Sequence, residues 1–365
     1  MNAPVIGAEA ELSEPGSWSI AYSWRHQRSD RHFRGSEEQW HRQAEGSEVI
    51  NNINMMEVQI TRTFTKRFSL SFGIPYLMMT RSSGIRDPSQ PDNRFGNSPV
   101  EQRTKSRATG VGDITIVPRW WIFDPVTHPG RNLSLGLGVK LPTGDNAVQD
   151  TRQFRVDDPN TTSEPFELEN RTQTVDQSIQ PGDGGFGYVA DLQGFYRFGS
   201  LFAGYVTGTY LINPQNTNGV ATYRGGNARL VENTPGSEAY MSVADQYLAR
   251  IGGAWFPTRG LGFSLGGRWE GVAVHDLIGE SEGFRRPGYA FSVEPGVTYT
   301  WRSHTFALSI PYAVHRDRKR SVPDLEVPPR QGDAAFADYV IIAGYFRRFG
   351  KGESTPTPGV DFSTP

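Results

Sequence analysis

Residues 110–144 show the clearest alternation of apolar and polar positions in the chain. In the segment ITIVPRWWI, every second side chain from Ile114 to Ile122 is apolar, and the positions between them include Arg119. In the segment LSLGLGVKL, aliphatic residues alternate with small residues and Lys140. This period of two predicts two β-strands joined by a turn. Both are longer than the about five or six residues usual in soluble sheets, and only one face is polar, so the pattern favours membrane strands between lipid and water.

The same pattern recurs along the chain and predicts twelve strands. The connections between them are alternately long and short, which is typical of an outer-membrane barrel with long extracellular loops and short periplasmic turns. The sequence therefore predicts an all-β fold, a single transmembrane antiparallel up-and-down β-barrel with both termini on the short-turn side. We expect the strands over residues 17–26, 55–64, 68–76, 113–122, 132–141, 186–198, 201–212, 244–256, 261–270, 289–302, 306–314 and 336–349.

Three regions follow from this prediction. Residues 1–16 are an N-terminal lead-in, residues 17–349 are the outer-membrane β-barrel, and residues 350–365 form a Pro/Ser/Thr-rich tail that we expect to be disordered. The lead-in lacks the basic start and apolar core of a signal peptide, so we expect the numbering to describe a mature or recombinant form. Residues 142–184 are the longest polar stretch, and we hypothesise that this loop folds inward and narrows the lumen.

Four prolines count against regular strands, because Pro75, Pro118, Pro295 and Pro311 lie within predicted ones. Proline removes a hydrogen-bond donor from the sheet, so we expect bulges or strand ends at these positions. The alternative is a soluble protein with many strands, but its surface would then carry a broad apolar band.

Composition narrows the classes of function. The chain has 365 residues, a formal net charge of −2 and no Cys, so a general affinity for nucleic acid, disulfides and a thiolate site are excluded. The mean hydropathy is −0.52, and no run of about 18 apolar residues predicts a membrane helix. A membrane barrel is compatible with both, because only alternate residues meet lipid.

Aromatic residues crowd the predicted short turns, where the interface with the membrane should carry an aromatic girdle. The candidates for lipid-interface aromatics are Phe64, Phe68, Trp120, Phe123, Phe198, Trp255, Phe256, Trp301 and Phe306.

Inward-facing positions carry charges of both signs, which allow three interpretations. They form a salt-bridged interior that fills a narrow barrel, or a pore wall that selects small polar or zwitterionic solutes, or a dedicated high-affinity site. The candidates for lumen or pore-lining residues are Glu57, Asp113, Arg119, Lys140, Asp191, Arg197, Arg250, Arg268, Glu270, Glu294 and Arg302.

The segments GVGDITIVPRWWIFDP and LGLGVKLPTGD resemble the core of the outer-membrane β-barrel family that is named for a role in the meta pathway of phenol degradation. Members of that family are described as outer-membrane transporters, and the resemblance implies uptake of aromatic or other hydrophobic compounds. Such cargo would need an apolar patch on the inner face, for which Met55, Leu77, Trp121 and Phe195 are candidates. The resemblance implies no catalytic residue.

The last strand resembles the assembly signal of outer-membrane proteins, with aromatic residues after Gly344 and a closing Phe349. It departs from the signal at Arg347 and in the residues that follow Phe349. We therefore expect the barrel-assembly machinery to recognise this strand from within the chain.

Enzymatic, metal and cofactor sites find little support in the sequence. A known twelve-stranded outer-membrane phospholipase has His and Ser two positions apart on one strand, and none of the seven histidines here has a Ser at that spacing. The cluster of His26, His32 and His41 is typical of a solvated loop rather than a metal site. The segments GDNAVQD and VDDPN leave a calcium-stabilised loop open. We predict no enzyme, no metal and no cofactor.

The sequence thus favours a porin-like channel in the outer membrane of a Gram-negative bacterium, for passive passage of small molecules. A closed structural or partner-binding barrel is the alternative, and a lipid hydrolase is the third. The expected partners are outer-membrane lipid, the barrel-assembly machinery and an unidentified small-molecule solute, with a surface or outer-membrane protein as a further candidate and no nucleic acid.

Overall fold

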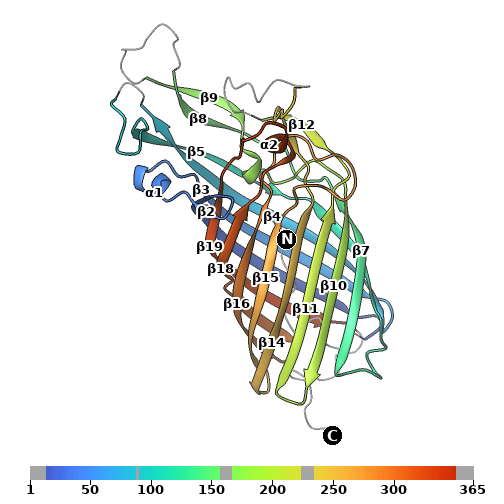
Figure 1. Ribbon diagram of the computed structural model, residues 1–365. Helices are drawn as coiled ribbons and strands as arrows, with labels where there is room; N and C mark the ends of the chain where they lie inside the picture. The colour runs from blue at the N-terminus through green and yellow to red at the C-terminus, as the bar shows by residue number, and fades with distance from the viewer. Residues whose placement is uncertain (1–13, 88–89, 157–166, 223–233, 351–365) are drawn as a thin grey trace.

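A computed structural model describes residues 14–87, 90–156, 167–222 and 234–350. These residues form a closed antiparallel barrel of twelve strands, which confirms the predicted fold (Figure 1). Two of the twelve are interrupted and carry two labels each. In chain order the barrel strands are β1 (Trp18–Arg34), β3 (Ile50–Thr63), β4 (Phe68–Arg86), β5 (Val100–Val111) with β6 (Ile114–Trp121), β7 (Arg131–Leu141), β10 (Gly187–Phe198), β11 (Phe202–Ile212), β14 (Gln246–Thr258), β15 (Leu261–Val272), β16 (Gly288–Trp301), β17 (His304–Ser309) with β18 (Tyr312–Arg318), and β19 (Ala334–Phe349).

The first and last strands close the barrel. β1 pairs with β19 from Trp18 opposite Phe349 to Phe33 opposite Ala334, with two register shifts on the way. Closure leaves no free sheet edge in the membrane, where an unpaired backbone group would find no water. Gly16 and Gly350 lie next to each other at the short-turn end, so the described chain begins and ends there. The predicted tail, residues 350–365, lies outside the described residues apart from Gly350.

Several strands run further than the sequence indicated. β1 continues to Arg34 through part of the predicted loop 27–46, and β4 and β5 extend through most of the predicted loop between Tyr76 and Gly110. The paired ends of β4 and β5 rise beyond the barrel, as Figure 1 shows at the upper left. Above the lipid both faces of a strand meet water or loops, so the apolar alternation that marks a membrane strand is absent there.

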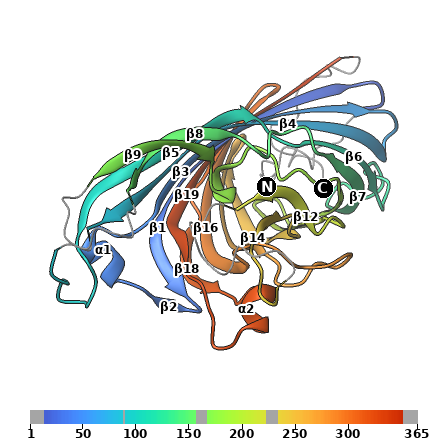
Figure 2. The ribbon, with the colours of Figure 1, turned by 90° about the horizontal axis from the view of Figure 1, so that it is seen from above.

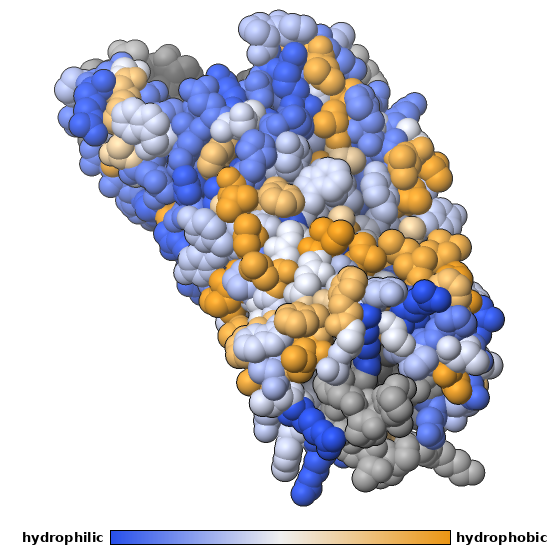
Figure 3. Space-filling view, turned by 60° about the horizontal axis from the view of Figure 1, so that its bottom comes forward, coloured by the Kyte–Doolittle hydropathy of each residue, from blue (hydrophilic) through white to orange (hydrophobic). Residues whose placement is uncertain are grey.

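The outer face of the barrel is apolar and the inner face is polar, the reverse of a soluble domain. Outward side chains such as Leu137 and Ile251 are 68% and 69% exposed, whereas inward Arg268 is fully buried. Figure 3 shows the apolar band as orange residues around the barrel wall, between bluer ends. This distribution fits a wall that meets lipid outside and encloses polar groups inside.

Each proline lies beside an irregularity of the wall, but only Pro311 lies at a strand end as predicted, while Pro75, Pro118 and Pro295 lie within strands and form regular pairs on one side. Pro75 faces the break between β5 and β6, where the register with β4 shifts by one residue. Pro311 separates β17 from β18, and Pro295 accepts a hydrogen bond from the amide of Ile310 at this break. Pro118 lies where β6 and β7 lack register partners for two residues.

Shorter elements lie at the long-loop end, which Figure 2 shows from above. The hairpin of β8 (Gln149–Arg155) and β9 (Leu168–Thr174) lies along β5, and the amide of Gln153 donates a hydrogen bond to Thr104 Oγ1. Across the described ranges, no helix is both long and apolar enough to cross a membrane. The remaining elements are β2 (Glu37–Glu38), α1 (His41–Glu45), the 3-10 helix η1 (Gln177–Ile179), β12 (Thr217–Ala221), β13 (Tyr240–Ser242) and α2 (Val322–Glu326).

Candidate functional site: the barrel lumen

One ion pair crosses the inner wall between β6 and β10. Period-two alternation turns Arg119 and Asp191 inward, and β7 between them offers only Gly136 at this level. The Nη2 atom of Arg119 lies 2.6 Å from Asp191 Oδ1, and both residues are buried. Thr209 Oγ1 donates a second hydrogen bond to Asp191, at 3.1 Å. The carboxylate is therefore held from two sides.

A larger network lies on the opposite wall. Arg250 donates two hydrogen bonds to Glu294, from Nε at 3.0 Å and from Nη2 at 2.7 Å. Arg268 donates to Glu270 at 2.7 Å and lies 3.8 Å from Glu294. Arg25 of β1 donates to both oxygens of Glu270 at 3.1 Å. We name these groups the ion-pair belt: Arg25, Arg119, Asp191, Arg250, Arg268, Glu270 and Glu294.

A cavity of about 1330 Å³ lies on the long-loop side of the belt. Arg25, Arg119, Asp191 and Glu270 are among the residues that line it, while Arg250, Arg268 and Glu294 line a second space of only about 40 Å³. Charged and apolar residues share the wall of the large cavity, including Met55 and Leu77 of the predicted apolar patch. The lumen therefore offers a mixed surface wide enough for small solutes.

Part of the loop 142–184 folds into this cavity. Residues 174–178 and 180–183 line it, and Ile179 is fully buried against Met79, Ala108 and Val175. Asp176 accepts two hydrogen bonds of 2.8 Å from Arg286 and forms an ion pair with Arg81. Burial raises the pKa of Asp176, but the charges of Arg286 and Arg81 outweigh it and hold this pKa well below its usual range. The hairpin β8–β9 of the same loop lies along β5, and Arg152 and Thr174 of this hairpin also line the cavity.

Three Gly-Asp segments fasten the base of this loop to the wall. The carboxylate of Asp113 accepts hydrogen bonds from the amide of Gly144, at 2.9 Å, and from the amide of Asp183, at 3.1 Å. Lys140 Nζ donates to Asp183 and lies 3.8 Å from Asp113. Gly144 and Gly182 touch backbone to backbone, so a Cβ on either would collide. The segments GVGD, PTGD and PGDG thus form one hydrogen-bonded cluster that attaches the base of the loop to the wall.

The predicted lumen residues divide into three groups. Glu57, Asp113, Arg119, Lys140, Asp191 and Glu270 line the large cavity, and Arg250, Arg268 and Glu294 lie beside the small space. Arg197 is opposite Ala203 on the inner face near the short-turn end. The structure places Arg302 elsewhere, in the turn after β16, where it has a φ of 54° and lies over the ring of Trp301. The turn begins one residue earlier than the alternation suggested.

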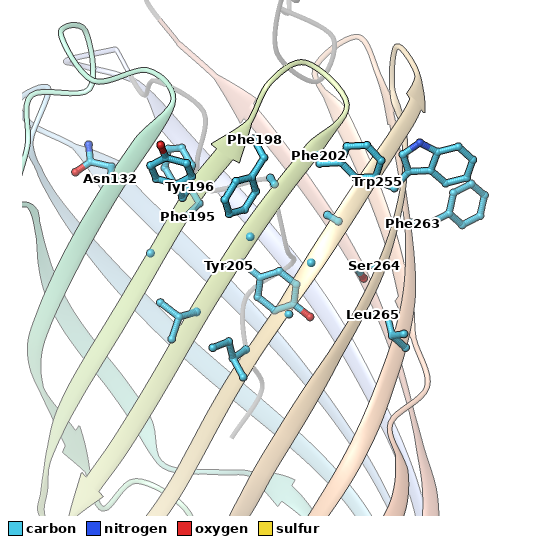
Figure 4. A pocket seen from close by; sticks show the side chains of 18 of the residues that line it. Asn132, Phe195, Tyr196, Phe198, Phe202, Tyr205, Trp255, Phe263, Ser264 and Leu265 are labelled. Carbon is cyan, nitrogen blue, oxygen red and sulfur yellow. The ribbon is translucent and has the colours of Figure 1, made fainter.

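The predicted interface aromatics cluster on the outer face with one difference. Phe198, Phe202, Trp255 and Phe263 form one cross-strand row, which borders an outer hollow of about 910 Å³ (Figure 4). Phe256 lies on the inner face, against Gly262, because it follows outward Trp255 directly. The other predicted aromatics keep outward positions: Phe64, Phe68, Trp120, Phe123, Trp301 and Phe306.

The wall has an opening in its ladder between β18 and β19. Tyr312 and Tyr339 are the one register pair between these strands in the described chain, and β1 reaches β18 again at Gly35 and Arg318. Arg316 bridges the space between, where its Nε donates to Ala337 O at 3.0 Å and its Nη2 donates to Asp338 at 2.7 Å. We name residues 313–318 and 334–338 the side window. Residues of both segments line the large cavity, so the window adjoins the lumen.

Sequence reasoning missed several of these groups. The alternation along its strand points the side chain of Arg25 inward, but the residue lies near a predicted loop and was not among the candidates. Arg316 and Asp338 lie where β18 and β19 no longer pair, so strand phase says nothing of their contact. The partners of Asp176 come from distant segments and had no signal.

No group of three or more His, Cys, Asp or Glu side chains is placed to hold a metal ion within the ranges that the structure covers. His32 instead has a structural role: its Nε2 accepts from the amide of Val49, so Nδ1 carries the proton toward Asp333 at 2.8 Å. Most of the segment VDDPN lies outside the described residues. A calcium-stabilised loop stays a prediction.

The extracellular loops should loosen in acid. Burial raises the pKa of Asp333 and of Glu45, but it is outweighed by several groups together, chiefly His32 and Arg42 at Asp333 and Arg86 and Ser47 at Glu45, which lower each pKa to about 2. Because these folded-state values lie below the ordinary ones, the two carboxylates stabilise the loops above about pH 4, and this contribution is lost as the pH falls toward 2. We expect pepsin to cleave residues 35–49 and 319–333 much faster at pH 2 than at pH 4.

Asp333→Asn should show the fast cleavage at pH 4 already, whereas Glu37→Gln, at an exposed position, should behave as wild type. Equal cleavage of Asp333→Asn and wild type at pH 4 would contradict the assigned role of Asp333.

Comparison with known proteins supports the fold. No family model matches the chain, and no curated protein matches it in sequence, so the family resemblance stays a prediction. An outer membrane channel from Pseudomonas putida F1 is 13% identical, with a TM-score of 0.54 over 96% of this chain and 100% of that one. The toluene transporter TodX of Pseudomonas putida is 9% identical, with a TM-score of 0.46 over 92% of this chain and 90% of that one. The translocator domain of the autotransporter NalP from Neisseria meningitidis is 10% identical, with a TM-score of 0.45 over 94% of this chain and 92% of that one. The chain has the fold of outer-membrane β-barrel proteins.

Proposed function

We propose that this protein is an outer-membrane channel for passive passage of small molecules. The observation that carries the proposal is the large cavity, which lies between the loops and the ion-pair belt and is lined on the belt side by the side chains of Arg25, Arg119, Asp191 and Glu270. Side chains can move aside, whereas a barrel filled by backbone would stay shut. The similar structure from Pseudomonas putida F1 is itself described as an outer membrane channel, which supports the proposal.

The belt sets the polarity of what passes along the axis. Its four guanidinium groups are all paired with its three carboxylates, so an ion or zwitterion must replace part of a pair as it passes. Such rings of charge select solutes in channels. Small polar or zwitterionic molecules are therefore the proposed axial cargo.

The side window favours a second cargo, small aromatic or other apolar molecules. Small side chains such as Ala313, Ala335 and Ala337 lie along it, and Phe33 and Phe336 meet edge to face at 5.8 Å. An apolar solute that reached the cavity would leave through the wall here, at its long-loop end, without crossing the belt. This route fits the hydrophobic cargo that the family resemblance implies.

Conductance in planar bilayers tests the axial route. We expect small discrete current steps for the wild type, because the belt is narrow. The double variant Arg25→Ala/Glu270→Ala removes two side chains from the floor of the cavity and should at least double the single-channel conductance. Leu137→Ala, on the exposed outer face, is the matched control and should leave it unchanged. Silence of all three proteins would instead favour a closed structural barrel.

A further inference from the structure

The short-turn end of the barrel carries an excess of positive charge. Besides Arg119, Arg197 and Arg348, which point toward the lumen, seven basic residues of the described chain lie in the turns or within two residues of a strand end there, against two carboxylates, Glu14 and Asp124. The chain as a whole has a net charge of −2, so the excess belongs to this end and not to the composition. We name this set the basic rim: Arg62, Lys66, Arg67, Arg131, Arg259, Arg302 and Arg347.

The basic rim differs from the other charged regions in its partners. The belt and the loops pair their arginines with carboxylates, but no member of the rim forms an ion pair with any described residue. Arg67 donates to the carbonyl of Trp121 at 2.8 Å, and Arg62 donates to the carbonyl of Gly16 at 2.6 Å. Neutral carbonyl partners leave the positive charge of these groups uncompensated.

The side chains of the rim lie beside the lipid face rather than the lumen. Arg62 is opposite outward Trp18, Arg131 is opposite outward Tyr196, and Arg347 is opposite Ile20. Because directly paired residues of an antiparallel sheet share a face, all three arginines point outward. The guanidinium of Arg62 lies 4.9 Å from the ring centroid of Trp18. Blue residues at the lower end of the orange band in Figure 3 mark the same boundary.

We infer that the basic rim binds the headgroups of anionic phospholipids in the periplasmic leaflet, an inference that rests on the proposed membrane location. Aromatic side chains mark the interface, and basic groups one step beyond them lie at the depth of lipid phosphates. Guanidinium matches a phosphate with two parallel hydrogen bonds. A surface that steered anionic solutes into the lumen would point its charges inward, and these three point outward.

Quenching of tryptophan fluorescence by brominated lipid tests the inference. Trp18, Trp120, Trp255 and Trp301 are 39–52% exposed at this interface and serve as reporters. The protein is reconstituted in phosphatidylcholine vesicles with increasing brominated phosphatidylglycerol or brominated phosphatidylcholine. We expect the wild type to bind phosphatidylglycerol more than tenfold more strongly, because each basic residue near a charged surface contributes about fivefold to such a preference.

Arg62→Gln/Arg131→Gln/Arg347→Gln should lose at least tenfold of this preference. The matched control, Arg34→Gln/Lys105→Gln/Arg107→Gln, removes the same charge from exposed positions at the loop end and should keep it. Equal quenching by the two lipids in wild type, or equal losses in both variants, would overturn the inference. Conductance measured with the same lipids separates this inference from the proposed function. Conductance without a lipid preference would contradict only the proposed lipid binding by the basic rim. A lipid preference without conductance would contradict only the proposed channel function.

Discussion

Glu294→Gln is expected to lower the free energy of unfolding by about 3–5 kcal/mol, the usual cost of removing one partner from a buried ion pair. Glu294 is 1% exposed, and its carboxylate faces two buried guanidinium groups, those of Arg250 and Arg268. Without the carboxylate, two positive charges remain in the wall with one acceptor fewer, and water cannot replace it without opening the belt. Urea unfolding of the barrel in lipid vesicles, followed by tryptophan fluorescence, measures the loss.

Glu37→Gln removes the same charge from an exposed position and should change the unfolding free energy by less than about 0.5 kcal/mol. The same substitution at Glu294 should shift the belt toward net positive charge, so the channel should favour anions over cations in reversal-potential measurements. A Glu294→Gln protein with wild-type stability and wild-type ion preference would show that Glu294 contributes neither to the stability nor to the selectivity of the belt.

The energetics of buried ion pairs favour the proposed role of the belt in passage over one of filling alone. Buried ion pairs contribute little net stability compared with apolar residues of the same size, because the cost of removing charges from water offsets their attraction. If these side chains only had to fill the barrel, Leu and Phe would fill it with similar stability. The seven charged side chains of the belt are instead consistent with the selective passage that we propose.

Strand positions could be predicted from the sequence because the membrane imposes one simple pattern. A residue of β6 such as Ile116 faces lipid and its neighbour Val117 faces the lumen, so the period of two persists over the whole span. Arg119 and Asp191 were found by the same rule. Their contact across β7 was not, since it depends on Gly136 leaving room between them.

Above the membrane the pattern ends, and prediction ends with it. Lys105 and Arg107 lie on a regular strand of the extension, yet both faces of that strand are polar and the sequence looked like a loop. The inward fold of the loop 142–184 could be proposed from its length. Its attachment through Asp176 to Arg286 joins groups that lie far apart in sequence, and no local signal identifies such a pair.

In the proposed channel, the belt and the side window together divide the lumen by polarity. In this proposed channel the belt offers charged groups that exchange partners with a polar solute, and the window offers alanines and phenylalanines at the long-loop end of the wall. One cavity feeds both. Cargo that is too apolar to displace an ion pair therefore has one remaining direction, through the wall between β18 and β19.

Arg316→Ala should open this route. Arg316 replaces the missing backbone ladder with side-chain hydrogen bonds to Ala337 O and Asp338, and charge-assisted bonds of this kind contribute about 1.5–3 kcal/mol each. Their loss should raise amide hydrogen exchange in residues 313–318 and 334–338 about tenfold or more. It should also speed the entry of a small aromatic hydrocarbon into vesicles through the protein, while single-channel conductance stays at the wild-type level because the belt is untouched. Arg34→Ala, an exposed arginine at the same end, controls for loss of charge. If hydrocarbon entry and conductance rose together, the window and the axial path would be one passage, and the division of cargo by polarity would fail.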